Sequence, residues 1–206
     1  MKKMIMVLVA MAVVMAAPGA MAQITNTLHD FSGASWNSGG EICEPCHTPH
    51  NGDMSVVVLW NHDVTTNSFN VYTSATLHAS VGQPSAESEG CLSCHDGTVA
   101  LDAFGGAAGS TNLTGTTLLG TDLSDDHPIS FAYDNALFTT DGELHDPANT
   151  ASGVGTGNID DDMLFGASND QLECASCHDP HGSAGHSSLL VKSNAGSALC
   201  LTCHDK

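Results

Sequence analysis

Arginine is absent from the 206-residue sequence, and lysine occurs only four times against 23 acidic residues. The formal net charge is −19 at neutral pH, and it becomes more negative if Lys2 and Lys3 leave with an N-terminal leader. Binding to nucleic-acid phosphates requires a basic surface, so nucleic acid is excluded as a partner. Anionic substrates are disfavoured for the same reason.

Aromatic residues are also scarce, at 5% of the chain, whereas glycine occurs 21 times. Such a composition provides only a thin hydrophobic core for a domain of this length. We therefore expect another component to fill the interior. The sequence also lacks a glycine-rich phosphate motif, catalytic-triad spacing and any sustained helical period, so regular secondary structure should be sparse.

The first 22 residues have the features of a secretory signal peptide. Two lysines precede an apolar run, and an A-x-A-like cleavage position ends at Ala22. The run is short for a membrane span, and no second hydrophobic segment follows it. No cysteine precedes Cys43, so a mature N-terminus has no thiol for lipid attachment. We expect residues 1–22 to be a signal peptide, and residues 23–206 to be one secreted domain without a membrane span.

All eight cysteines lie in CxxCH motifs, where the second cysteine of each pair is followed directly by histidine. Disulfide pairing, the usual role of cysteine in an exported protein, gives no reason for that histidine. Heme attachment does, because two thiols three residues apart reach both vinyl groups of one porphyrin while the next imidazole binds the iron. The four motifs consist of Cys43, Cys46 and His47; Cys91, Cys94 and His95; Cys174, Cys177 and His178; and Cys200, Cys203 and His204.

The motifs therefore predict four covalently attached hemes c, each with a proximal histidine. Zinc is the alternative cofactor, because cysteine and histidine at short spacing also form tetrahedral sites. A zinc site would have to combine distant motifs, and it would leave histidines in surplus. Heme is the better interpretation.

Each iron also needs a second axial ligand, and eight histidines lie outside the motifs. We favour bis-histidine ligation at all four irons over a methionine ligand from Met54 or Met163, which would raise the reduction potential. Three of the eight histidines lie among small and polar residues, and we expect them to be exposed: His78, His145 and His186. The five favoured ligands are His29, His50, His62, His127 and His181, which leaves one candidate too many for four irons.

The local sequence supports each of these five. His50 and His181 follow their motif histidines by three residues, past a proline, so each lies near the proximal side of its own heme and should bind a neighbouring one. His62 and His127 lie at the ends of short strand-like segments. His29 is close to the expected mature N-terminus, where an iron bond would order a mobile end or reach another subunit.

The expected fold is a multiheme cytochrome c that is rich in loops, with short helices around the CxxCH motifs, a few short strands and a heme-packed core. The third and fourth motifs are closest in sequence, so their hemes should be neighbours. The insert over residues 98–171 predicts loops and short strands around the second heme. Acidic clusters at residues 125–126 and 160–162 lack a calcium-loop pattern, so they are interpreted as solvated surface.

Several longer segments resemble the OmcE-type tetraheme cytochromes, which polymerise into extracellular nanowires. The resemblance covers nearly the whole mature chain, and it implies a filament of identical subunits with continuously stacked hemes. It also implies bis-histidine ligation, with one histidine, most readily His29, donated across the subunit interface. The segments are HDFSGASWNSGGEICEPCHTPHN at 29–51, VLWNHD at 58–63, CLSCHDGTVALD at 91–102, DHPISFAYD at 126–134, and LECASCHDPHG and NAGSALCLTCHDK near the C-terminus.

The leading functional hypothesis is therefore electron transfer to extracellular acceptors. The protein would act as a self-polymer at the cell surface that also contacts other redox proteins. A monomeric periplasmic electron shuttle is the alternative, although such shuttles often carry a lysine-rich docking face and this chain does not. A heme enzyme with an open iron is disfavoured by the surplus of histidine and the absence of arginine. We expect no catalytic residues.

Overall fold

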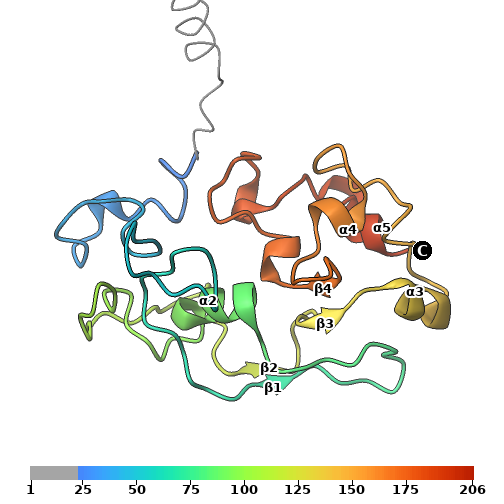
Figure 1. The fold of residues 1–206 in the computed structure, drawn as a ribbon, viewed down its shortest axis with the longest axis horizontal. Helices are drawn as coiled ribbons and strands as arrows, with labels where there is room; N and C mark the ends of the chain where they lie inside the picture. The colour runs from blue at the N-terminus through green and yellow to red at the C-terminus, as the bar shows by residue number, and fades with distance from the viewer. Residues whose placement is uncertain (1–22) are drawn as a thin grey trace, which may run out of the picture.

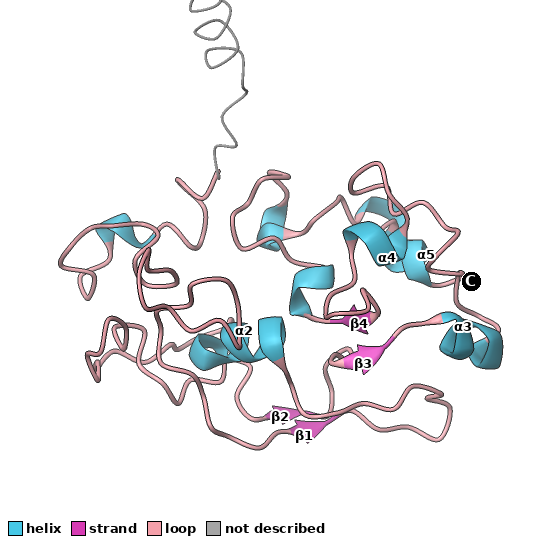
Figure 2. Ribbon diagram, in the orientation of Figure 1, coloured by secondary structure: helices cyan, strands magenta, loops and turns pink. Residues whose placement is uncertain are grey.

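The computed structural model of the protein describes residues 23–206, so the expected signal peptide, residues 1–22, lies outside the described residues. Loops and turns make up most of the chain (Figure 2). The α-helices are α2 (Ala86–His95), α3 (Asn135–Asp141), α4 (Ile159–Asp162) and α5 (Cys200–Cys203). Short 3-10 helices are η1 (Phe31–Gly33), η2 (Cys174–Ser176), η3 (Ser187–Leu189) and η4 (Ala195–Ser197). The strands are β1 (Asn70–Val71), β2 (Asp122–Leu123), β3 (Phe131–Ala132) and β4 (Gln171–Leu172).

The strands form two separate two-stranded sheets. β1 pairs with β2 in parallel, with Asn70 opposite Asp122, and β3 pairs with β4 in antiparallel register, with Phe131 opposite Leu172. In Figure 1 the β3–β4 sheet lies to the right of α2 and the β1–β2 sheet lies below them, and the N-terminal part of the chain occupies the opposite side of the view from the C-terminal part. The expectation of a loop-rich chain with short helices and a few short strands is confirmed.

The main hydrophobic core belongs to the C-terminal part of the chain. It joins β3, α3, α4, β4 and the residue before α5, and its members are Phe131, Tyr133, Leu137, Ile159, Met163, Leu164, Leu172 and Leu199. A second cluster contains only Phe69, Leu92 and Leu123. Both cores are small for the number of described residues, as the composition indicates.

Capping interactions at α3 set the path of the chain toward the last CxxCH motif. The carboxylate of Asp134 accepts a hydrogen bond from the backbone N–H of Leu137 at 2.8 Å, which caps the first turn. Gly142 ends the helix with a φ of 73°, a left-handed conformation that glycine adopts without strain. The chain then turns back, so that the N–H of His145 donates to the carbonyl of Cys203 at 2.8 Å.

The insert over residues 98–171 is therefore divided between two motifs, and the expectation that it surrounds the second heme holds only in part. Its first section lies against the second motif, since the N–H of Leu119 donates to the carbonyl of His95 at 2.8 Å. Its later section, including α3 and α4, packs in the main core beside the fourth motif. The physical reason is that its apolar residues cluster late in the insert, so burial draws that section into the core.

Gly90 in α2 allows a close approach between the first and second motif regions. A Cβ atom at this position would lie 3.0 Å from Cγ1 of Val56, in the loop that follows the first motif. The absence of a side chain therefore lets that loop pack directly on α2. Within residues 23–206, no helix is both long and apolar enough to cross a lipid bilayer.

Candidate heme-binding sites

Each CxxCH motif forms a single helical turn. The second motif ends α2, the third begins in η2 and the fourth forms α5, while the first is a turn closed by the N–H of His47 donating to the carbonyl of Cys43 at 2.8 Å. The same bond joins His178 to Cys174 and His204 to Cys200, at 3.0 Å in both cases. Residues three and four apart on a helical turn share one face, so both thiols and the imidazole point to the same side.

Three of the four motif histidines are oriented by backbone carbonyls. Nδ1 of His47 lies 2.8 Å from the carbonyl oxygen of Val58, and Nδ1 of His95 lies 2.8 Å from that of Thr117. Nδ1 of His178 lies 2.9 Å from the carbonyl oxygen of Ser188. Because a carbonyl only accepts, the proton must be on Nδ1, which leaves Nε2 with a lone pair for a metal. Sequence reasoning missed these partners, because a backbone carbonyl has no side-chain signature.

Three motif histidines face a second histidine ring at nearly equal separations. The ring centroids are 6.2 Å apart for His29 and His95, 6.2 Å for His47 and His181, and 6.3 Å for His127 and His204. Two imidazoles that hold one metal from opposite sides, with metal–nitrogen bonds of about 2.0 Å, have centroids roughly 6.3 Å apart. The observed separations therefore leave room for one iron between each pair of rings.

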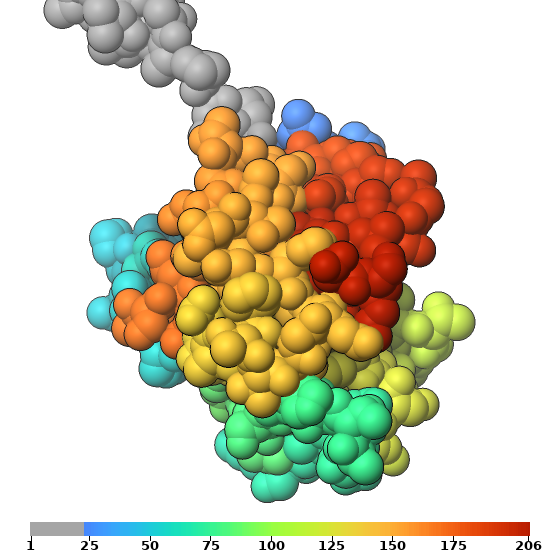
Figure 3. Space-filling view, turned by 90° about the vertical axis from the view of Figure 1, so that its right-hand side faces the viewer, coloured from blue at the N-terminus to red at the C-terminus, as the bar shows by residue number. Residues whose placement is uncertain are grey.

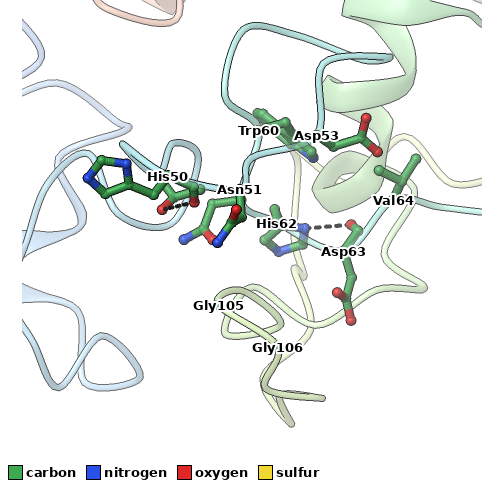
Figure 4. A pocket seen from close by; sticks show the side chains of 11 residues that line it. His50, Asn51, Asp53, Trp60, His62, Asp63, Val64, Gly105 and Gly106 are labelled. Carbon is green, nitrogen blue, oxygen red and sulfur yellow. Dashed lines mark hydrogen bonds between the residues drawn. The ribbon is translucent and has the colours of Figure 1, made fainter.

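Among the described residues, no ring faces His178 at such a distance. His178 itself is exposed. Of the five favoured ligands, His50 and His62 are the two without a facing motif histidine. Both line an open hollow of about 610 Å³, in which the labelled ring of His50 lies well apart from that of His62 (Figure 4).

His62 is held differently from the other four candidates. Its side chain is only 5% exposed, with Nδ1 2.8 Å from the carbonyl of Asp63 and Nε2 2.9 Å from the carbonyl of Ala100. Both ring nitrogens therefore already contact backbone oxygens, and Nε2 also lies 3.5 Å from Sγ of Cys94 in the second motif, whose histidine already faces His29. This geometry offers a physical basis for choosing among the five candidates, which the sequence did not.

His29 is placed within its own chain, whereas the resemblance implies a role across a subunit interface. Its Nδ1 lies 3.2 Å from the carbonyl oxygen of Pro180, and its ring packs near Phe31 as well as His95. Burial lowers the pKa of His29, and the nearby histidines add to this effect, so the neutral form that binds metal is favoured. The N-terminal segment is thus long enough to reach the second motif of the same chain.

The thiols of successive motifs lie close to one another. Cys46 acts electrostatically on Cys94, and the side chain of Cys91 interacts directly with that of Cys174, which raises the pKa of the Cys91 thiol. Cys177 in turn acts on Cys203, whose pKa burial raises to about 12. The motifs therefore follow each other in space in the same order as in the sequence.

The remaining histidines and methionines take no part in these pairs. His78 and His186 are exposed, as expected, whereas His145 is partly buried. Met163 is 2% exposed inside the main core, and Met54 is 64% exposed and accepts a hydrogen bond from the N–H of Leu59.

The residues around the motifs fit a porphyrin in their chemistry. No cysteine is used in a disulfide, so all eight thiols are available for thioether bonds. Exposed apolar side chains stand beside the motifs, notably Leu118 and Leu119 next to His95 and Leu201 inside the fourth motif. Large apolar side chains exposed in this way are suited to covering the face of a bound ring.

Glu173, which the sequence did not single out, connects the second and third motifs. It is 1% exposed, and its carboxylate accepts hydrogen bonds from Ser88 of α2 and from Ser130, the latter at 2.7 Å. The hydroxyl of Ser88 also accepts from the N–H of Cys174 at 2.9 Å. Burial raises the pKa of Glu173, while the serine hydrogen bonds oppose that shift.

The raised pKa of Glu173 predicts a pH-dependent stability. Between its ordinary pKa and the raised one, the folded protein keeps a proton that the unfolded chain releases, so the free energy of unfolding falls as pH rises through this window. Glu173→Gln should remove that slope, whereas Glu89→Gln on the partly exposed side of α2 should retain it. Guanidinium unfolding at a series of pH values from about 4 to 8 measures both, and an unchanged slope in Glu173→Gln would contradict the assignment.

Comparison with known protein families identifies the C-terminal part of the chain. Residues 167–206 match the family model for the doubled CXXCH motif, which covers the third and fourth motifs together. The chain has no significant match among curated proteins. The matched motifs indicate covalently bound heme c and electron transfer. With the paired-ring geometry, this match indicates a multiheme c-type cytochrome.

Proposed function

We propose that the protein carries four covalently attached hemes c and moves electrons along them as the subunit of an extracellular cytochrome filament. The observation that carries the proposal is the common separation of 6.2 to 6.3 Å between three motif histidines and their facing rings. An axial ligand on each side of the iron produces six-coordinate sites, which are suited to electron transfer and leave no position for a substrate. We propose no enzymatic role.

In this function the chain's own residues orient the axial histidines, hold the heme rings and place the four sites in a row. Bound heme supplies an iron that changes between ferric and ferrous states. Backbone carbonyls hold the proton on Nδ1 of the motif histidines and orient Nε2, and thioether bonds from the cysteines hold each ring in place. Because the four motifs follow one another in space, an electron entering at one end has a neighbouring site at each step.

The junction between subunits is proposed to lie at His178. This histidine is exposed and faces no other ring among the described residues, and His50 is the exposed ligand candidate that remains without a motif partner. His50 of an adjacent copy would complete the ligation at His178 and link the heme row of one subunit to the next. This assignment replaces His29, which has a partner within its own chain, as the donor across the interface.

A monomeric periplasmic shuttle is the second candidate, and one observation favours it. The resemblance assigns His29 to an interface. In this structure, however, Nδ1 of His29 contacts the carbonyl oxygen of Pro180, and its ring faces His95 of the same chain. A chain in which His50 also turned toward its own His178 would need no partner for complete ligation.

Negative-stain electron microscopy of the protein from outside its native cells tests the two candidates, together with intact mass and a heme stain. Heme-staining filaments of uniform width, with a subunit mass that includes four hemes, support the filament. Particles that carry four hemes and stay monomeric at high concentration support the shuttle. A chain without covalent heme would overturn both.

A further inference from the structure

The fourth motif lies beside a lysine that has no acidic partner. Lys192 is partly buried, and its ammonium group donates hydrogen bonds to the carbonyl of Ser152 at 2.7 Å and to Oγ1 of Thr202 at 2.9 Å. Thr202 stands between the two cysteines of the fourth motif. The other lysine of the described residues, Lys206, is exposed and pairs with the carboxylate of Glu143.

The site around this ammonium group is closely fitted. A Cβ atom at Gly153 would lie 2.8 Å from Nζ of Lys192, and this glycine has a φ of 66°, so a larger residue would be strained and would displace the lysine. Lys192 therefore reaches its position through contacts with neutral oxygens only. Within residues 23–206, the two lysines have no carboxylate within 4 Å other than that of Glu143.

Buried carboxylates, by contrast, accompany the second and third motifs. Asp96 follows the second motif and is 4% exposed, and Glu173 precedes the third and is 1% exposed, whereas Glu44 inside the first motif is exposed. The carboxylates near the fourth motif are more exposed: Asp205 and Glu143 are exposed, and Asp141 is partly exposed and lies 3.0 Å from His78.

We infer that Lys192 makes the heme attached at Cys200 and Cys203 the most readily reduced of the set. This inference rests on the proposed heme attachment. When one electron passes from a neighbouring ferrous iron to the ferric iron held by His204, the receiving site loses one positive charge and the donor site gains one, with no proton transferred. A fixed cation stabilises the reduced site, and its effect is screened least where solvent is partly excluded. The buried carboxylates Asp96 and Glu173 act in the opposite sense at the second and third motifs.

The arrangement has a consequence for the direction of electron flow. Electrons that enter the chain at another motif collect at the fourth, which holds them most strongly. The fourth motif lies at one end of the molecule, where the C-terminal segment in red is exposed next to residues of the later insert in yellow and orange (Figure 3). Lys192 thus acts through its charge on the reduction potential of this heme and is not a metal ligand.

A spectroelectrochemical titration of the purified holoprotein tests the inference. Lys192→Met keeps the length of the side chain and removes its charge, so it should lower the highest midpoint potential and leave the other three in place. Lys192→Arg should retain the wild-type value. Lys206→Met is the matched control, because it removes a solvent-exposed charge that is already paired with Glu143, and it should change the highest potential far less.

Heme content is measured on the same samples by intact mass, and thermal unfolding checks that each variant is folded. Unchanged potentials in a folded, fully loaded Lys192→Met protein would overturn the inference and leave the proposed function intact. A uniform shift of all four potentials would also overturn it, because that result reports a general loss of charge. A wild-type chain without covalent heme would instead overturn the proposed function itself.

Discussion

Production of this chain without heme attachment should yield a protein with no cooperative unfolding transition. The main core contains eight buried hydrophobic residues and the second cluster only three, and no helix in the described part is longer than the ten residues of α2. Ordering the backbone opposes folding by about 1–2 kcal/mol per residue. These small clusters cannot offset that entropy over 184 residues, so the porphyrin faces and the thioether bonds must supply most of the stabilisation.

The measurement compares the heme-loaded protein with a chain secreted by cells that lack the attachment machinery. Circular dichroism and calorimetry during heating should show a sharp transition only for the loaded protein. Its free energy of unfolding should lie in the usual range of about 5–15 kcal/mol, whereas that of the heme-free chain should be near zero. A reductant keeps the thiols from forming disulfides in the heme-free chain. A heme-free chain that melts sharply would show that protein side chains alone form the core.

Replacement of His29 with alanine should open one iron to external ligands. His29 faces His95 at 6.2 Å, and loss of its ring leaves that iron with only the motif histidine. The reduced variant should therefore bind one more equivalent of carbon monoxide per chain than the wild type in the same assembly state. The oxidised variant should show a matching loss of low-spin absorbance.

His62→Ala is the control for this experiment. Both ring nitrogens of His62 contact backbone carbonyls, so its removal should decrease stability by about 1–3 kcal/mol through lost hydrogen bonds and packing. It should not add a carbon monoxide site. An extra equivalent in His62→Ala, with none in His29→Ala, would reverse the assignment of the two histidines.

The same titration separates the two candidate functions. If His50 ligates an iron of the next subunit, wild-type monomers should bind one equivalent of carbon monoxide and filaments none. His50→Ala should then leave folded monomers that do not assemble. Wild-type monomers that bind no carbon monoxide would instead show that the chain completes all of its own ligation, as a shuttle requires.

The heme motifs could be identified from the sequence because their chemistry is local. Two thiols and an imidazole lie within five residues, and one helical turn brings them to the same face whatever surrounds them. The scarcity of aromatics and long apolar runs likewise predicted a loop-rich chain, which the short helices and two-residue strands confirm. In the same way, the doubled motif of residues 167–206 is recognisable without any knowledge of the fold.

The pairing of candidate histidines with motif histidines arises only in three dimensions. The partners of His95, His47 and His204 lie 66, 134 and 77 positions away in the sequence, and no local pattern specifies which of these distant segments meet. Long-range contacts of this kind arise from the packing of the whole chain. The burial of Glu173 between two motifs and the placement of Lys192 beside the fourth depend on the same packing, because burial and neighbouring charge are properties of the fold and not of the residue.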